Sequence, residues 1–241
     1  MNLYGNLSDE AAMAGMLYGM NPKTIVSIPA SETINFGKAV FLNAEKTALV
    51  GGKYNNKAVI DLSAYTTASK DIVLTIKGVE IEATTSGTIA TDVAAIVEDI
   101  NEIEGVTAIA GTGADAGKIT VTSDDSADLG VKLSYDGSDV TSSKVTASSD
   151  CVYAGVAVFH QNAFINSRGC YAAKEAVNVM EKGYVYGVLA DNVTPEIEAS
   201  AYVTTAGLFT TSSSGTTLVG KFKSGAKAGS NSDALALVSI E

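Results

Sequence analysis

The chain has 241 residues, of which 46% are apolar and 18% charged, so it can bury one large core or two smaller ones. Sixteen basic against 27 acidic residues give a formal net charge of minus 11, and no basic stripe is present, which argues against nucleic-acid binding. The sequence contains neither a run of roughly 18 apolar residues, as a membrane span requires, nor an amino-terminal secretory signal.

The first 22 residues differ in character from the rest of the chain. Four of the five methionines lie in this segment, and three glycines interrupt it. Such a segment cannot bury itself, and flexible thioether side chains suit an adaptable contact. Two interpretations stay open, because the segment either contacts another protein or packs under its own domain. The first predicts an interface formed by Leu3, Tyr4, Leu7, Met13, Met16, Leu17, Tyr18 and Met20.

Short β-rich runs bounded by Pro or Gly begin after this segment, at residues 24–28 and 38–42. Similar runs return after residue 150, and glycines separate them at the spacing of antiparallel all-β folds. These later runs are residues 152–159, 175–180, 184–189, 201–204, 218–222 and 235–240. We therefore expect residues 23–67 and 150–241 to form one antiparallel β-sandwich or barrel.

Residues 68–149 have a different pattern. Two strand-like runs meet at Gly78, and three more lie at 106–109, 118–122 and 130–134. Between them, apolar residues recur at helical spacing, with Thr88 or Thr91 as the N-cap. These apolar residues are Ile89, Val93, Ile96, Val97, Ile100 and Ile103. The order ββαβββ predicts an inserted α+β domain, and the whole chain is predicted to be mainly β.

The sequence offers little for catalysis. The only histidine, His160, has no nucleophile motif near it, so a packed or hydrogen-bonded side chain is the favoured interpretation. Cys151 and Cys170 are too few for a zinc site, and buried free thiols are favoured over a disulfide. We expect no catalytic residue.

Acidic residues are also better explained without a bound group. The cluster Asp124, Asp125 and Asp128 lacks the glycine and the closing glutamate of a calcium loop. The glycine-rich run 111–117 lacks the Lys-Ser/Thr of a phosphate loop and is interpreted as a hairpin tip. The helix carboxylates, Glu98, Asp99, Glu102 and Glu104, lie on its predicted solvent face. We therefore expect no metal and no cofactor.

Four segments in chain order carry a resemblance to a known family. They are INFGKAV (34–40), AGVAVF (154–159), EAVNVMEKGYVYGV (175–188) and the pair AYVT (201–204) with VGKF (219–222). Together they resemble the structural cement proteins of tailed-bacteriophage heads, over residues 1–65 and 150–241. The middle part resembles a small repeat of flagellins and some phage fibres, through 76–79, 92–101, 105–108 and 119–122. Typical cement proteins lack this insertion.

The resemblance implies a non-enzymatic virion protein on the outer surface of the capsid, assembled in the host cytoplasm. Its implied partner is the major capsid protein, whose neighbouring subunits it would cement. The low charge and the long β-runs add an expectation of self-association as a trimer or dimer. The alternative is an adhesin or fibre-like module that displays the inserted domain to a cell-surface ligand. An enzyme built around His160 ranks third.

Overall fold

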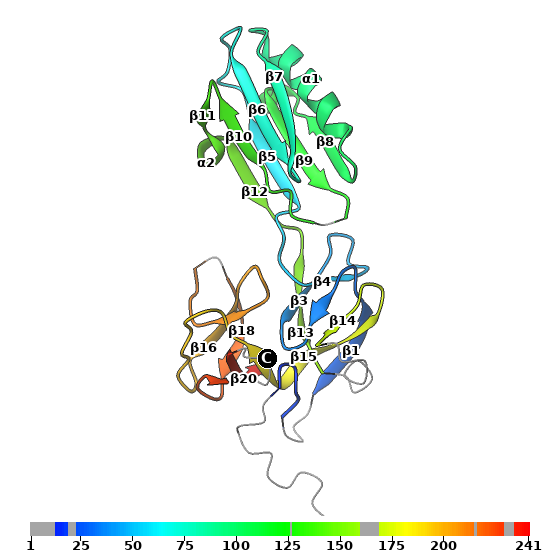
Figure 1. Ribbon diagram of the computed structural model, residues 1–241, viewed down its shortest axis with the longest axis vertical. Helices are drawn as coiled ribbons and strands as arrows, with labels where there is room; N and C mark the ends of the chain where they lie inside the picture. The colour runs from blue at the N-terminus through cyan, green and yellow to red at the C-terminus, as the bar shows by residue number, and fades with distance from the viewer. Residues whose placement is uncertain (1–12, 19–22, 126, 160–168, 215, 229–233) are drawn as a thin grey trace, which may run out of the picture. The chain divides into compact units, whose positions relative to one another are not determined.

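The chain folds as two compact units. The computed structural model (Figure 1) describes residues 13–18, 23–125, 127–159, 169–214, 216–228 and 234–241. Unit 1 comprises Met1–Lys53 and Val152–Glu241, and unit 2 comprises Tyr54–Cys151. Both units are mainly β, as the sequence pattern predicts, and unit 2 interrupts unit 1 as an insertion. In the described residues, no helix is long and apolar enough to cross a membrane.

The insertion begins earlier in the chain than the predicted 68–149. Strand β5 (Lys57–Asp61) pairs with β9 (Lys118–Ser123) and with β12 (Val145–Ser148). Both partners belong to unit 2, so their hydrogen bonds assign residues 54–67 to the insertion. The predicted range 23–67 of the β domain shortens by the same residues. Residues 66–70 are mostly small and polar, as in a linker between domains. They nevertheless form a loop inside unit 2 and do not mark the boundary between the units.

Unit 1 is built around the long strand β15 (Ala176–Val188), which has neighbours along both of its edges. Strands β1 and β20 pair with it, and so does β13. The sequence pattern predicted two strands here, at 175–180 and 184–189, and the structure has one. The other strands are β1 (Thr24–Pro29), β2 (Ile34–Asn35), β3 (Ala39–Leu42), β4 (Leu49–Val50), β13 (Val152–Ala157), β14 (Cys170–Tyr171), β16 (Ser200–Val203), β17 (Phe209–Thr210), β18 (Thr217–Phe222), β19 (Lys227–Ala228) and β20 (Ala234–Ile240).

The sheet of unit 1 curls into two barrel-like rings that share β15 (Figure 1). The first ring runs β15-β13-β3-β4, and a bridge between Ala30 and Leu49 returns it to β1 beside β15. The second runs β15-β20-β18-β16-β17, and a bridge between Leu189 and Phe209 closes it. Each ring has buried aromatic residues: Phe36 and Phe41 in the first, and Phe209 and Phe222 in the second.

Closure of the second ring depends on a glycine in β15. A Cβ atom at Gly187 would lie 2.4 Å from the Phe209 ring, which is closer than packed carbon atoms approach. Only a residue without a side chain lets the ring of Phe209 rest on the shared strand.

Unit 2 contains two four-stranded antiparallel sheets, ordered β11-β10-β6-β7 and β12-β5-β9-β8. Its hairpin turn at Lys77-Gly78 has positive φ angles of 49° and 79°, as a tight type I′ turn requires. The predicted helix is present as α1, and its N-cap is Thr88. The remaining elements are β6 (Asp71–Ile76), β7 (Val79–Thr84), α1 (Ile89–Asn101), β8 (Val106–Ala110), the 3₁₀ turn η2 (Gly113–Asp115), β10 (Lys132–Tyr135), β11 (Ser138–Asp139) and α2 (Thr141–Lys144).

The two sheets of unit 2 share one core, and the helices cover the gaps between them. Helix α1 contacts β7 of one sheet and β8 and β9 of the other, and it buries Val93, Ile96 and Ile100. On the other side, α2 contacts β10 and β12. The alternate residues of the strands point into the same cluster. Unit 2 therefore has a closed core of its own.

Candidate functional site

The described part of the amino-terminal segment, residues 13–18, lies along β15. The amide of Gly15 donates to the Tyr186 carbonyl at 2.8 Å, and the Tyr186 amide donates to the Met16 carbonyl at 3.0 Å. The Tyr18 amide donates to the Tyr184 carbonyl at 3.1 Å. These bonds and an isolated antiparallel bridge between Leu17 and Val185 attach the segment to unit 1.

Gly15 fixes the position of the amino-terminal segment on unit 1. Its φ angle is +72°, and a Cβ atom there would lie 2.8 Å from the Ala157 carbonyl oxygen and 2.9 Å from the amide nitrogens of Gly37 and Phe159. A larger residue would be strained by its backbone conformation and would also collide with three backbone atoms. The glycine pattern of the segment is the sequence signal for this contact.

Some side chains of residues 13–18 pack against unit 1, and others are exposed and available for contact with another protein. Ala14 and Met16 pack against a buried cluster formed by Tyr186, Val188, Leu235 and Leu237. Met13 and Leu17 are also half-buried. Tyr18 is 54% exposed and stands edge-on to Tyr186, with ring centroids 6.2 Å apart. The other residues of the predicted interface, Leu3, Tyr4, Leu7 and Met20, lie outside the described residues.

Exposed apolar side chains are concentrated in unit 1. Seven large apolar residues are exposed in the described part of the chain, and five belong to unit 1: Tyr18, Ile25, Val152, Ile197 and Leu218. Leu218 of β18 lies opposite Tyr202 of β16 in the sheet register. Sequence reasoning missed Leu218, because only the strand pairing shows that it points away from the core, and it missed Ile197, which lies exposed in a turn before β16.

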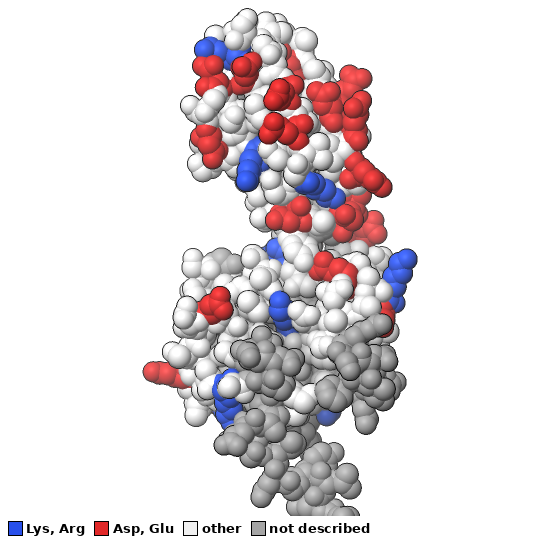
Figure 2. All heavy atoms as spheres, viewed as in Figure 1, with Lys and Arg blue, Asp and Glu red and all other residues white. Residues whose placement is uncertain are grey.

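Charge is divided between the units in the opposite way. Sixteen of the 27 acidic residues but only six of the 16 basic residues lie in unit 2, so it carries a formal net charge of minus 10 and unit 1 carries minus 1. Acidic side chains gather along the side of unit 2 that carries α1 (Figure 2). Glu98, Asp99, Glu102 and Glu104 are exposed there, as predicted for a solvent face.

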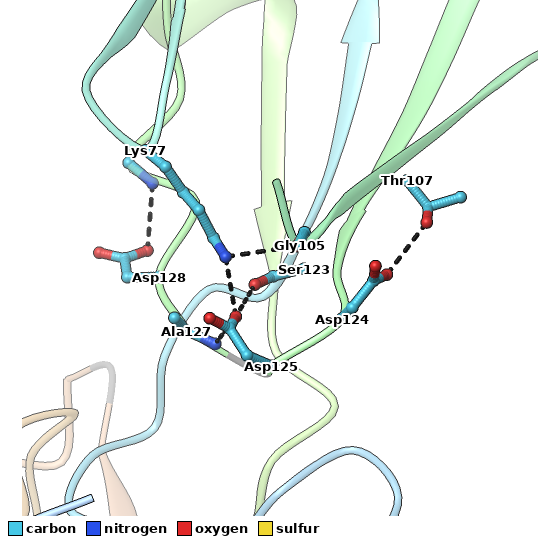
Figure 3. A network of polar contacts seen from close by, with 9 residues as sticks. Lys77, Gly105, Thr107, Ser123, Asp124, Asp125, Ala127 and Asp128 are labelled. Carbon is cyan, nitrogen blue, oxygen red and sulfur yellow. Dashed lines mark hydrogen bonds and ion pairs between the residues drawn. The ribbon is translucent and has the colours of Figure 1, made fainter. Parts of the chain in front are cut away.

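The cluster Asp124, Asp125 and Asp128 forms local contacts in a turn (Figure 3). The Lys77 ammonium donates to Asp125 Oδ1 at 2.8 Å and to the Gly105 carbonyl at 3.2 Å. Partial burial raises the pKa of Asp125, but hydrogen bonds from Lys77, Ser123 and the Ala127 amide outweigh it and lower the pKa to about 2. Each carboxylate has a donor from the chain, since Asp124 accepts from Thr107 and Asp128 from the Gly130 amide.

The described residues contain no group of three or more His, Cys, Asp or Glu side chains that could hold a metal ion. Cys151 and Cys170 are free thiols, but only Cys151 is buried as predicted and Cys170 is half-buried, while His160 lies outside the described residues. A hollow of about 240 Å³ in unit 2, with Asn55, Asp128 and Lys132 among its lining residues, is smaller than the roughly 300–1,000 Å³ of typical ligand sites.

Comparison with known proteins identifies one family. Residues 106–241 match the family described as "Structural cement protein (E217 gp24/Pam3 gp6)". No curated protein sequence matches the chain. The matched residues include all of unit 1 after the insertion and also β8 to β12 of unit 2. They contain three of the four resembling segments, whereas residues 34–40 precede them. The match covers more than half of the chain, which therefore belongs to the phage structural cement protein family.

Proposed function

We propose that the protein binds the outside of an assembled phage head through unit 1 and cements neighbouring major capsid protein subunits. Family membership supports a non-enzymatic structural role in the virion capsid. The proposal that unit 1 binds the head rests on the position of the family match. The matched residues 106–241 include residues 152–241, which form the whole carboxyl-terminal part of unit 1.

The surfaces of the two units support unit 1 as the binding part. Binding removes water from an interface, which is favourable for apolar side chains and costly for unpaired charges. Unit 1 is nearly neutral and exposes five large apolar residues, whereas unit 2 carries a formal charge of minus 10. Shell binding through unit 1 leaves the acidic unit in solvent, where its charge keeps the free protein soluble.

The amino-terminal segment belongs to the proposed contact. Tyr18 offers an exposed aromatic ring held by Tyr186, and such rings are frequent anchors of interfaces. Met13, Met16 and Leu17 serve mainly to hold the segment on unit 1, while Leu3, Tyr4, Leu7 and Met20 complete the proposed interface. Self-association as a dimer or trimer would join several such contacts, so that modest individual affinities add up to avidity.

Co-sedimentation with undecorated phage heads tests this proposal. The full chain is compared with a chain that lacks residues 1–12 and with one in which a short Gly-Ser linker replaces Tyr54–Cys151. The first truncation keeps residues 13–18, so the cluster around Tyr186 stays covered. On sparsely loaded heads, we expect the chain without unit 2 to bind as well as the full chain, and the truncated chain to bind more weakly.

A Tyr18→Ala variant and a Val79→Ala variant provide a matched pair, because each removes one exposed side chain from a different unit. Only the change at Tyr18 should weaken binding. If the full chain does not sediment with heads, shell attachment is contradicted. If deletion of unit 2 abolishes binding while unit 1 still melts cooperatively, the contact lies in unit 2 instead, and the display of that unit to another ligand becomes the function to test.

A further inference from the structure

One face of unit 2 has a composition unlike the rest of that unit. Strands β12, β5, β9 and β8 turn their alternate residues outward, and the register aligns these residues in rows across the sheet. The first row consists of Thr146, Val59, Thr120 and Ile109. The second row consists of Ser148, Lys57, Thr122 and Thr107.

This outer face is accessible and weakly charged. Every residue of the two rows is at least partly exposed, and Ile109 is 65% exposed. The first row has no charged side chain. The second has Lys57 in the middle, and the Asp124 carboxylate that accepts from Thr107 lies at its rim. A third row pairs Asp61 with Lys118, whose ammonium bonds the Asp115 carboxylate at 2.7 Å, so charges of both signs lie at this end of the face.

We propose that this face packs against the same face of a second copy of the chain when copies stand side by side on the head. Charge selects the partner. Two units of formal charge minus 10 repel each other wherever their carboxylates meet, and this face lets them approach without opposing unpaired carboxylates. A basic partner would be drawn instead to the carboxylates beside α1.

The register also makes the face self-complementary. A two-fold axis parallel to the strands places β8 of one copy over β12 of the other and keeps each row opposite itself. Ile109 then faces Thr146, and Val59 faces Thr120. Lys57 faces Thr122, so the two lysines do not meet.

The size of the face explains why this contact needs crowding. Strands about 4.8 Å apart and about 3.3 Å per residue give four strands of five residues an area of roughly 300 Å². A standard interface buries about 800 Å² on each partner. The contact is weak in dilute solution and gains strength from the high local concentration on a shell. This increase in strength depends on the proposed attachment to heads, whereas the contact itself does not.

Disulfide trapping tests the geometry in the full chain. Proteins carrying Ile109→Cys and Thr146→Cys are mixed on phage heads and oxidised mildly. We expect a severalfold excess of the mixed dimer over the dimer formed by Val79→Cys with Thr146→Cys, because Val79 is also exposed but lies on the other sheet. Unsubstituted protein gives the background of Cys151 and Cys170. Equal yields in the two mixtures would refute the proposed packing.

A charge variant tests the energetic consequence. Ile109→Lys with Thr146→Lys places a lysine of one copy opposite a lysine of the other without touching the core, because both side chains are exposed. Loading onto heads should lose its cooperativity, while the affinity at sparse loading stays unchanged. Cooperativity equal to that of the unsubstituted protein would contradict the contact. If heads are not bound at all, shell attachment fails separately, and the trapping experiment repeated in concentrated free protein should still give the mixed dimer.

Discussion

The two units differ in how their β-structure is protected from contact with other chains. Unit 2 covers the outer edge of β8 with its own groups, since the Asn101 side-chain nitrogen donates to the Ala108 carbonyl and its oxygen accepts from the Ala108 amide. Helix α1 and a high negative charge protect the rest of the unit from aggregation. Unit 1 is nearly neutral and leaves large apolar side chains uncovered. The comparison indicates that the edge of unit 2 beside α1 needs no partner, whereas the exposed apolar side chains of unit 1 favour contact with another protein.

The largest expected effect tests whether the units have separate cores. Phe222 is fully buried in the second ring of unit 1, and its replacement by Ala should lower the free energy of unfolding of unit 1 by about 3–5 kcal/mol. The unfolding of unit 2 should not change. Calorimetry with hydrogen exchange separates the two transitions. An equal loss in unit 2 would show that the two cores unfold as one.

The corresponding core substitution in unit 2 lies in helix α1. Ile100 is fully buried, so Ile100→Ala should lower the stability of unit 2 by about 2–5 kcal/mol. Ile109→Ala is the matched control, because this exposed side chain has little burial to lose and should change stability by about 0.5 kcal/mol or less. Denaturant unfolding followed through unit 2 amides measures both. A similar effect of the two variants would place Ile109 in a core contact.

A smaller effect concerns the attachment of the amino-terminal segment. Gly15→Ala should cost about 1–2 kcal/mol for its left-handed backbone and more for its collisions with neighbouring backbone atoms. Gly78→Ala isolates the first term, because φ there is +79° and a Cβ atom meets nothing within 4 Å. Hydrogen exchange at the Tyr18 and Tyr186 amides reports release of the segment. Equal costs at the two glycines would argue against tight docking at Gly15.

The smallest effect is a pH dependence confined to unit 2. The pKa of Asp125 is about 2 in the folded protein and about 3.9 in an unfolded chain. Its ionised form therefore stabilises unit 2 above pH 4, and this contribution is lost as the pH falls from about 4 to 2. The carboxylate is largely exposed, so Asp125→Asn should cost less than about 1 kcal/mol at pH 7.

Acid titration of unit 2 unfolding measures this contribution. The Asp125→Asn variant should lose less stability than the unsubstituted protein between pH 4 and pH 2, and Lys77→Ala should flatten the same range. Unchanged acid sensitivity in both variants would mean that the ion pair does not contribute to stability.

Much of the fold could be predicted from local pattern. The helical spacing from Ile89, the Lys77-Gly78 turn and most strands of unit 1 lie where the periodicity places them. The boundary at Tyr54 could not be predicted, because β5 is assigned by hydrogen bonds to strands about 60 and 90 residues away. The same limit applies to the contact surfaces. Whether Met16 faces the core or Leu218 the solvent depends on pairing partners that no local pattern reveals.

The pairing of β5 with β12 also affects how the chain reaches its native state. The amide of Asp150 donates to the Asn56 side chain at 2.9 Å, so folded unit 2 holds the two ends of the insertion together. An unfolded insertion of about 100 residues would cost unit 1 roughly 4 kcal/mol of loop-closure entropy when β3 pairs with β13. Folding of unit 2 first removes most of that cost. We therefore expect unit 1 to fold faster when the insertion is already folded, whereas the described core of unit 2 consists only of its own residues.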